Sequence, residues 1–338
     1  MSSTETLLIK RHDVSQLLTI EECIAAVEQA FKSYAAGEAP APGILGIHTQ
    51  DGGFHIKAGI LNLGRHYFVA KINANFPGNS KKNGLPIIQG VITVCDAENG
   101  RLLALMDSIE ITIIRTGAAT AVAAKYLSPA NAKTVTICGS GNQGKISLRA
   151  VMKVRQLEKV FVYDIDEKKS LQFTHELSEE LNIYIHPVRD LRRAVIQSDI
   201  CITCTPSKKP FLLREYIAPG TFIAAVGADN EDKQELESSL LISGKLVTDI
   251  TAQCAAIGEL HHAIKTGLMK QSDVYAELGQ IIAGEKPGRA SDEEIIIFDS
   301  TGTALQDIVS AAIVYEKAIS GNFGMKLNFA EQGSINTI

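Results

Sequence analysis

The chain has 338 residues, a formal net charge of −5, and lysine and arginine scattered along its length. This length suffices for two domains of ordinary size, and the negative, unclustered charge argues against a nucleic-acid or anionic-membrane surface. No apolar run reaches the roughly 18 residues that a membrane-spanning helix needs, and the first residues lack the basic and apolar regions of a signal peptide.

Six cysteines are spread over the chain, and several lie inside apolar runs. This distribution is typical of reduced core thiols in a cytoplasmic protein rather than of a disulfide framework. Cys201 and Cys204 have the spacing of a CxxC motif, but no second pair accompanies them. Core packing is therefore the favoured interpretation, and we expect no metal site.

The N-terminal part combines one helix with a β-rich segment. Thr19 and Glu22 form a capping-box pattern at the start of a helix that Gly37 ends. Between about residues 40 and 107, Gly and Asn turns separate short strands, and Asn99-Gly100 predicts a hairpin. These strands look too few and too open-edged to close a sheet alone, which favours a homodimer.

A helix rich in small residues is predicted from Thr112 to Leu127, where Ser128-Pro129 stops it. Arg115 and Thr116 open its Gly- and Ala-rich segment. A cation before a run of small residues can bind a carboxylate or phosphate closely. A surface arginine is the commoner case, so the residues alone leave both interpretations open.

A glycine-rich loop follows the apolar stretch 134–138. Its pattern is Gly139-x-Gly141-x-x-Gly144, and a helix begins near Asn142. Gly139 allows the tight turn, Gly141 lets the backbone approach a pyrophosphate, and Gly144 lets the helix pack on the strand. The pyrophosphate would bind the unpaired N–H groups at the helix N-terminus. The pattern predicts a dinucleotide site of the Rossmann type rather than an ordinary glycine turn.

Asp164 ends the next predicted strand and indicates which dinucleotide binds. A carboxylate there accepts hydrogen bonds from a ribose 2′-OH and repels a 2′-phosphate. Lys168 and Lys169 lie close by, but no arginine does. NAD is therefore favoured over NADP as the cofactor, and the alternative is an ordinary acid at a strand end.

Between about residues 131 and 300, predicted strands alternate with helices, which is the rhythm of a doubly wound parallel sheet. The predicted strands are Val135–Cys138, Val160–Tyr163, Ile200–Thr203, Phe222–Val226, Leu246–Thr248 and Ile295–Phe298. A last helix from Ala304 to about Ser320 precedes an irregular tail. We expect an α/β protein with an NAD-binding Rossmann domain at 130–303. A discontinuous α+β domain for substrate binding and dimerisation would comprise 1–129 with 304–338.

Four further positions carry chemistry that local patterns do not resolve. Lys71 interrupts an apolar strand, and either points to solvent from an edge or lies in a cavity. Asp229 follows a buried strand at its carboxyl end, where ligands bind in open α/β sheets, or is a solvated loop acid. His55 and Lys57 share one face of a strand that either is exposed or lines the substrate site.

Seven segments together resemble the ornithine cyclodeaminase/mu-crystallin family, which includes archaeal-type alanine dehydrogenases and cyclic ketimine reductases. They are Lys71 to Asn79, Gly84 to Pro86, Leu105 to Asp107, Arg115 to Ala119, the glycine loop, Val226 to Leu236 and Phe298 to Gly302. The resemblance covers nearly the whole chain and implies a homodimer whose N-terminal domains share a β-structure.

The resemblance implies roles for individual residues. Lys71 matches the active-site lysine, Arg115 the arginine that binds the substrate carboxylate, and Asp229 the acid that assists deamination. Thr116 would help to bind the cofactor phosphates. The remaining expected cofactor contacts are Gln143, Thr205, Val226 and Ser300.

The chain departs from the family pattern at two places. Gly43 stands where the family usually has Arg or Lys, and His55 lies near the position of a glutamate that meets the distal ammonium of ornithine. A cation facing that ammonium would repel it, at a cost on the order of 1 kcal/mol or more, which argues against ornithine as substrate.

The sequence therefore predicts an NAD(H)-dependent oxidoreductase acting on the C–N bond of a small L-amino acid, with or without cyclisation. Arg115, Lys57 and His55 would bind the substrate, and Lys71 and Asp229 would be catalytic. Because ketimine reductases that resemble mu-crystallin lack the acid at the position of Asp229, its presence favours deamination. The alternatives are a cyclic ketimine reductase of the pyrroline-2-carboxylate type and a non-catalytic binding protein.

Overall fold

A computed structural model describes residues 5–328, and residues 1–4 and 329–338 of the expected N-terminal domain lie outside this range. The chain divides into two compact units. The first comprises residues up to 26, 37–115 and from 304 onward, and the second comprises 27–36 and 116–303. The division falls inside a helix at 115/116, whereas the sequence analysis places it at 129/130. Within residues 5–328, none of the helices combines the length and apolar content that crossing a bilayer requires.

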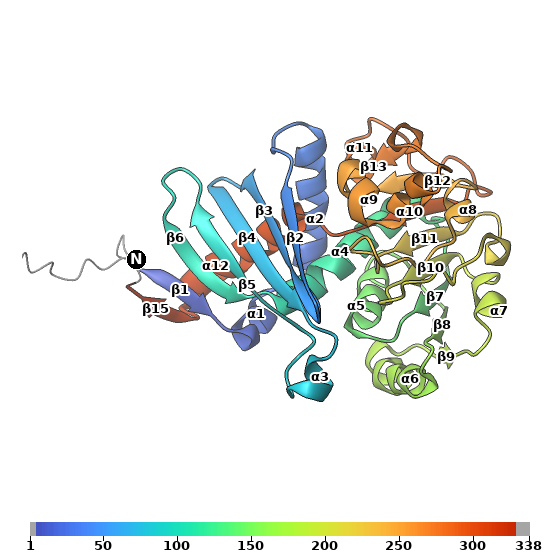
Figure 1. Cartoon of the computed structure of the whole chain (residues 1–338), viewed down its shortest axis with the longest axis horizontal. Coiled ribbons are helices and arrows are strands. Elements are labelled where there is room, and N and C mark those ends of the chain that lie inside the picture. Colours follow the sequence, from blue (N-terminus) through green and yellow to red (C-terminus); the bar gives the residue numbers. More distant parts are fainter. Residues whose placement is uncertain (1–4, 329–338) are drawn as a thin grey trace, which may run out of the picture. The chain divides into compact units, whose positions relative to one another are not determined.

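The first unit is built on a mixed seven-stranded sheet in the order β15-β1-β6-β5-β4-β3-β2 (Figure 1). Its elements are β1 Thr6–Ile9, α1 Arg11–Leu17, β2 Gly43–Thr49, β3 Gly52–Asn62, β4 His66–Asn75, α3 Asn79–Lys82, β5 Ile88–Asp96, β6 Leu102–Asp107, α12 Ala304–Gly321 and β15 Met325–Leu327. Helix α2 Ile20–Ala35 crosses the boundary at 26/27 and belongs to both units. Strands β2 to β6 form an antiparallel meander, and β1 joins β6 in parallel. The discontinuous origin of this unit follows from α12 and β15, which come from the far end of the chain.

Helix α12 covers one face of this sheet and contacts β3, β4 and β5 (Figure 1). The covered face includes Gly59, where an added Cβ would lie 3.1 Å from Ile308 Cδ1. Because alternate residues of a strand point to the same side, Lys57 and Lys71 share this face with Gly59. The two lysines are also register partners on β3 and β4. The sheet therefore directs both cations toward α12.

The opposite face of the meander carries exposed apolar side chains. Leu45 and Ile47 on β2, Phe54 on β3 and Ile72 on β4 are exposed. Leu45 pairs with Ile56 and Ile47 with Phe54, so these side chains lie on one continuous surface. Strand β2 has β3 as its one neighbour among the described strands and leaves its other edge open.

Two local predictions in the first unit, a capping box and a hairpin turn, are confirmed. Glu22 N–H donates to Thr19 Oγ1 at 3.3 Å, and Thr19 N–H donates to Glu22 Oε2 at 3.2 Å, which is the predicted capping box of α2. The hairpin at Asn99-Gly100 joins β5 to β6. Gly100 has φ +77°, a value that glycine adopts without strain.

The second unit is a doubly wound α/β fold around an eight-stranded sheet in the order β13-β12-β14-β11-β10-β7-β8-β9 (Figure 1). Its elements are β7 Thr134–Cys138, α5 Asn142–Val151, β8 Lys159–Tyr163, α6 Glu167–Leu181, β9 Ile185–Pro187, α7 Leu191–Val195, β10 Ile200–Thr203, η1 Arg214–Tyr216, β11 Phe222–Ala225, α8 Ser238–Leu241, β12 Lys245–Thr248, α9 Thr251–Ile257, α10 Glu259–Lys265, η2 Gln271–Asp273, β13 Ala276–Glu277, α11 Leu278–Ile282 and β14 Ile296–Asp299. The strand pairs are parallel, so the predicted Rossmann class is confirmed.

Several details differ from the sequence analysis. The segment expected to be an irregular tail contains strand β15, which pairs with β1. Helix α4 spans Ile109–Leu127 and begins before the predicted Thr112, because Asp107 Oδ1 accepts the Ile109 N–H at 2.9 Å and starts the helix earlier. Arg115 therefore lies inside α4 rather than at its opening. The short strands β9 and β13 were not predicted, because two or three residues carry no periodicity.

Candidate active site

The glycine loop connects β7 to α5, as its pattern predicts. Gly139 has φ +109°, which glycine alone adopts readily, and an added Cβ at Gly144 would lie 2.1 Å from the carbonyl oxygen of Gly139. At Gly141, by contrast, a Cβ would meet no protein atom within 4 Å. Gly141 is also the N-cap of α5 and makes no side-chain cap. The loop thus presents open space and a helix N-terminus to a ligand.

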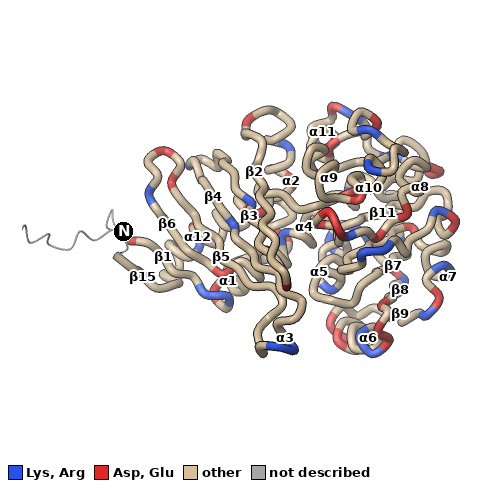
Figure 2. The backbone as a smooth tube through the Cα atoms, viewed as in Figure 1, with Lys and Arg blue, Asp and Glu red and all other residues tan. Residues whose placement is uncertain are grey.

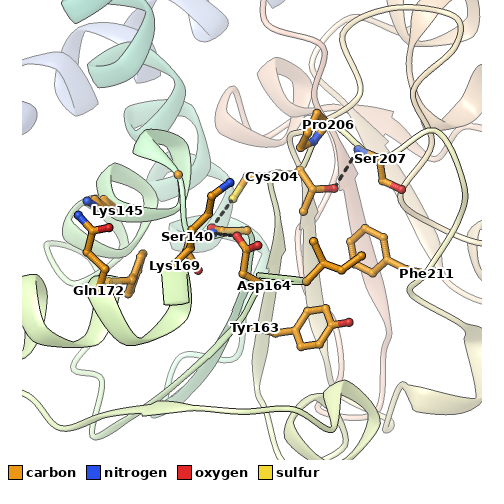
Figure 3. A pocket seen from close by; sticks show the side chains of 15 residues that line it. Ser140, Lys145, Tyr163, Asp164, Lys169, Gln172, Cys204, Pro206, Ser207 and Phe211 are labelled. Atoms are coloured by element: carbon orange, nitrogen blue, oxygen red, sulfur yellow. Dashed lines mark hydrogen bonds between the residues drawn. The ribbon is translucent and has the colours of Figure 1, made fainter. Parts of the chain in front are cut away.

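A pocket of about 590 Å³ adjoins this loop, a size typical of ligand sites. Asp164 lines it at the end of β8, with Oδ2 accepting the Ser140 N–H at 2.9 Å and Oδ1 the Asp166 N–H at 3.0 Å. Figure 3 shows Lys169 on one side of Asp164 and Phe211 on the other. These two backbone N–H groups hold the Asp164 carboxylate at the pocket, where the carboxylate can accept a hydrogen bond from a ribose hydroxyl.

The other predicted cofactor residues divide into two groups. Thr205 follows β10 and lines the same pocket as Gly139, Gly141 and Asp164. Asn142 and Gln143 form the first turn of α5, and the buried Oε1 of Gln143 has no hydrogen-bond partner. Neither Asn142 nor Gln143 lines the pocket, and the same is true of the remaining residues, Thr116, Gly144, Val226 and Ser300.

Each residue of the second group occupies a defined place in the second unit. Thr116 precedes Gly117, where a Cβ would lie 2.8 Å from Ile146 Cγ1, so α4 packs closely on α5. Val226 continues β11 by donating its N–H to Thr203 O at 2.9 Å. The hydroxyl of Ser300 donates to Asp249 Oδ2 at 3.1 Å. The expected contact of Ser300 with the cofactor stays a prediction.

A buried acid that the sequence analysis did not single out organises the pocket loops. Glu235 accepts hydrogen bonds from Thr205 N–H and Oγ1 and from Gly227 N–H, at 2.5, 2.7 and 3.1 Å. It therefore joins the loop after β10 to the loop after β11. Burial raises the pKa of Glu235, and the donated hydrogen bonds oppose that effect.

Two more buried acids continue this arrangement through the second unit. Glu259 accepts the N–H groups of Glu235 and Leu236, and Asp299 accepts those of Glu259 and Leu260. Burial raises the pKa of Glu259 well above its ordinary range and that of Asp299 to about 7. Carboxylates at these positions satisfy backbone donors at turns where no strand or helix supplies an acceptor.

In the first unit, Lys71, Arg115 and Asp307 form a buried charge cluster. Asp307 Oδ1 lies 2.7 Å from Lys71 Nζ and 3.2 Å from Arg115 Nε. The first contact is a hydrogen bond, whereas the second is an ion pair without hydrogen-bond alignment. Arg115 also donates through NH1 to Gln306 Oε1 at 2.7 Å. The structure thus brings two predicted site residues together through two residues of α12.

Burial and neighbouring charge shift the proton affinities in this cluster. Burial and the nearby Arg115 lower the pKa of Lys71 to about 7, while Asp307 opposes them. For Asp307, burial pushes the pKa upward, but Lys71 and Arg115 outweigh it, so the pKa lies below its usual range. Lys71 can therefore gain or lose a proton near neutral pH while Asp307 stays ionised.

Lys57 and His55 lie on β3 beside this cluster. Lys57 is buried opposite Lys71 in the sheet, and its charge acts on both Lys71 and Asp307. His55 lies two residues away on the same face, half-buried, with its ring 6.4 Å from that of His48. The inward position of Lys57 answers the question that its sequence pattern left open, because it is not a solvent-facing cation.

Asp229 belongs to the second unit, in the loop that follows β11. Its Oδ1 forms an ion pair with Lys233 Nζ at 2.7 Å and accepts a hydrogen bond from Asn230 Nδ2 at 3.3 Å. The side chain is 40% exposed, so water and small solutes can reach it. The backbone carbonyl of Lys233 accepts a hydrogen bond from His262 Nε2 at 2.8 Å, which tethers the loop to α10.

All six cysteines are free thiols. Cys201 is buried in β10, whereas Cys204 lines the pocket and donates to the carbonyl of Cys138 at 3.3 Å. Core packing therefore describes Cys201 better than Cys204. Among residues 5–328, no group of three or more His, Cys, Asp or Glu side chains could hold a metal ion.

These two sites occur in a chain that belongs to the ornithine cyclodeaminase/mu-crystallin family, whose model matches residues 4–322. Alanine dehydrogenase of Archaeoglobus fulgidus is 37% identical over 326 residues, which cover 96% of this chain and 99% of that protein. The resemblance found in the sequence is thus confirmed.

Two solved structures are similar over nearly their whole length. An archaeal alanine dehydrogenase dimer with bound NAD has a TM-score of 0.92 at 38% identity, covering 96% of this chain and 99% of that one. The Delta(1)-pyrroline-2-carboxylate reductase of Thermococcus litoralis, in complex with NADH and L-proline, has a TM-score of 0.90 at 35% identity, covering 95% and 100%. Both are similar to this chain in fold and sequence.

The sequence analysis missed three candidate functional residues, which are Asp307, Gln306 and Glu235. Asp307 and Gln306 lie in a helix whose run of buried residues reads as core. The acid and the amide within this apolar run could have indicated a site, because buried polar side chains need hydrogen-bond partners. Glu235 stood inside a recognised family segment, but nothing local indicated which groups it would bind.

Proposed function

We propose that the protein is an NAD(H)-dependent oxidoreductase that acts on the C–N bond of a small L-amino acid. The observation that carries this proposal is the buried cluster of Lys71, Arg115 and Asp307 in a chain that also holds a glycine-loop pocket. Burying a cation costs free energy, so a buried cluster with more cations than anions indicates a functional site. A carboxylate-bearing substrate offers the charge that this cluster lacks.

The second unit fits NAD. The N-terminus of α5 and the open space at Gly141 suit a pyrophosphate, and Asp164 suits an unmodified ribose. Thr205, held by Glu235, lines the same pocket. When bound there, NAD supplies a hydride acceptor for oxidation and, in its reduced form, a hydride donor.

The first unit supplies the groups that bind and deprotonate the substrate. Arg115 and Lys57 hold the substrate carboxylate, and His55 lines the site beside them. In the oxidative direction, loss of the Cα hydride and of one N–H proton converts the amine to an imine. Lys71 takes that proton, because its pKa of about 7 leaves it partly neutral at physiological pH.

Asp229 acts after the hydride leaves. Its carboxylate orients a water molecule toward the imine carbon, and hydrolysis then yields a 2-oxo acid and ammonia. With a substrate that carries a distal amine, the same carboxylate would orient that amine for ring closure. The partial exposure of Asp229 and its ion pair with Lys233 suit a group that keeps its charge while it binds water.

A second candidate is the reduction of a preformed cyclic imine such as pyrroline-2-carboxylate. The similarity to the Thermococcus litoralis reductase favours it, since the chain matches that protein over 95% of its own length. The same cationic cluster would hold the carboxylate, and protonated Lys71 would supply the proton to the ring nitrogen.

The test is the absorbance of NADH with a panel of amino acids, oxo acids plus ammonia, and cyclic imines, followed in both directions. Deamination predicts turnover of a small L-amino acid and of the matching oxo acid with ammonia. Reductase activity alone on cyclic imines would select the second candidate. NADH binding without turnover of any panel member would overturn both and leave a non-catalytic binding protein.

We further propose that the protein is a homodimer located in the cytoplasm. The open edge of β2 and the exposed apolar face of β2 to β4 support self-association, because such surfaces mark interaction sites. Six free thiols, four of them buried, support a reducing compartment. Acidic and basic positions are interspersed along the backbone of each unit (Figure 2).

A further inference from the structure

Asp307 lies behind the two cations that it pairs with. Its side chain is 0% exposed, compared with 3% for Lys71 and 7% for Arg115. A single oxygen, Oδ1, contacts both cations, and the buried Oδ2 has no hydrogen-bond partner. All three side chains are thus almost fully enclosed, Asp307 most completely.

We propose that Asp307 is a positioning residue for the reaction proposed above. Through Oδ1 it fixes the amino group of Lys71 and the guanidinium of Arg115 side by side, so that Arg115 faces the substrate carboxylate while Lys71 exchanges a proton with the substrate nitrogen. It also supplies a permanent negative charge that lets Lys71 carry a proton among other cations. This inference rests on the proposed function, because it assigns Asp307 a task in that reaction.

The charges around Lys71 show why Asp307 controls the protonation of this lysine. Lys57 faces it from β3, Arg115 from α4 and Asp307 from α12, and its register partner on β5 is the apolar Ile92. From α2, Cys23 faces Arg115 and Asp307, but burial raises the pKa of its thiol to about 12, so it is neutral. Among the described residues, Asp307 is thus the carboxylate that acts most strongly on Lys71, against the two cations Arg115 and Lys57.

Helix α12 holds Asp307 in place and provides a matched control. Ser310 Oγ donates to the carbonyl of Gln306 at 2.8 Å and lies 3.3 Å from Cys23 Sγ, so this turn is fixed on both sides. Gln306 Oε1 accepts a hydrogen bond from Arg115 Nη1, and its side chain is uncharged. Replacing Gln306 therefore removes one hydrogen bond from Arg115 and leaves the charge of Asp307 beside Lys71 unchanged.

The first experiment compares the pH profiles of kcat/KM for Asp307→Asn and Gln306→Met with that of the unmodified enzyme. In the oxidative direction, activity requires neutral Lys71 and should rise through about pH 7. Removing the opposite charge in Asp307→Asn should move that rise to lower pH by about 1–3 units and increase KM. Gln306→Met should increase KM and leave the position of the rise unchanged.

Asp307→Glu keeps the charge but changes its reach, which covers the case in which Asp307→Asn does not fold. Its pH profile should rise near the unmodified position while kcat/KM falls, because the two cations are displaced. An unchanged kcat/KM in Asp307→Glu, or an unshifted profile in Asp307→Asn, would overturn the positioning role.

A second experiment does not need turnover. The free energy of unfolding is measured between about pH 4 and 10 for the unmodified protein, Lys71→Met, Asp307→Asn and the double variant. Because folding lowers the pKa of Lys71 from 10.5 to about 7, the stability difference between the unmodified protein and Lys71→Met should rise with pH from about 7 upward. In the Asp307→Asn background the same rise should begin at lower pH.

The two experiments separate the failure of this inference from the failure of the proposed function. If the rise begins at the same pH in both backgrounds, Asp307 does not control the proton on Lys71 and the inference is wrong. If it shifts as expected but no amino or imino acid is turned over, the proposed function fails and the charge pairing stands without a catalytic task.

Discussion

Asp164 illustrates how one side chain selects a cofactor. Two backbone N–H groups, of Ser140 and Asp166, hold its two oxygens, so the carboxylate cannot turn away from the pocket that it lines. A 2′-phosphate placed there would meet a fixed negative charge. Lys169 also lines the pocket, but on the far side of Asp164 from Phe211 (Figure 3).

We therefore expect NADH to bind more tightly than NADPH, and Asp164→Ser to reduce that preference by roughly tenfold or more. Fluorescence titration of both cofactors measures the two dissociation constants. Asp166→Ser is the matched control, because Asp166 caps α6 through the Lys168 N–H and does not line the pocket. Equal or tighter binding of NADPH by the unmodified protein would show that Asp164 does not select the cofactor.

Asp229 distinguishes the two enzymatic candidates. If turnover includes deamination, Asp229→Asn removes the charge that orients water and should slow oxidative deamination about 100- to 10,000-fold. Reduction of a preformed cyclic imine needs no attack by water and should slow less. NADH binding should be unchanged, because Asp229 does not line the glycine-loop pocket.

The control for this prediction is Asp232→Asn in the same loop. Asp232 is exposed and forms an ion pair with Lys208 at 2.9 Å. Such surface pairs contribute little, so rates should stay close to those of the unmodified enzyme. Deamination at the unmodified rate in Asp229→Asn would identify Asp229 as an ordinary loop acid.

At the scale of elements, buried carboxylates fasten the loops at the carboxyl ends of the parallel strands. The loops after β10 and β11 would otherwise end in unpaired N–H groups, since the sheet stops there. Glu235 receives three hydrogen bonds from Thr205 and Gly227 and so fixes both loops at the pocket. The order of the pocket thus depends on a residue that does not line it.

Glu235→Gln should lower the free energy of unfolding by about 1–3 kcal/mol, because an amide NH₂ replaces one acceptor and leaves a buried donor unpaired. NADH should also bind more weakly, since Thr205 is released. Thermal unfolding and NADH titration measure the two effects. Glu237→Gln, which affects a single N–H donated by Arg214 at 3.2 Å, should change neither by much. NADH affinity equal to that of the unmodified protein would exclude this role of Glu235.

For the whole molecule, the apolar outer face of the first unit predicts a dimer in dilute solution. Leu45→Glu with Ile47→Glu places two charges on the open strand β2, where the side chains are 54% and 49% exposed. We expect this double variant to sediment as a monomer at micromolar concentration. Leu171→Glu on α6, a residue that is 57% exposed in the second unit, should leave the dimer intact.

Two results would contradict the proposed dimer. If the unmodified protein is a monomer at micromolar concentration and retains full activity, the exposed face of β2 to β4 serves another purpose. A Leu171→Glu variant that dissociates as readily as the β2 variant would show that added surface charge, rather than the β2 face, causes dissociation.

The sequence by itself determined the parts of this protein that depend on short segments. The spacing of Gly139, Gly141 and Gly144 predicted a particular turn between a strand and a helix, and the backbone geometry at Gly139 and Gly144 excludes side chains. The capping box at Thr19 and the turn at Asn99-Gly100 follow from hydrogen bonds within a few residues. Apolar runs that alternate with helical segments likewise predicted most of the parallel strands and hence the Rossmann class.

Only the tertiary structure decided what surrounds the functional groups. Lys71 and Asp307 are far apart in the sequence, and no local pattern indicates that Lys71 Nζ lies 2.7 Å from Asp307 Oδ1. The pairing exists because α12 packs on β3 and β4, so that two lysines in register face one acid. Burial then lowers the pKa of Lys71, an effect that depends on neighbours rather than on sequence spacing.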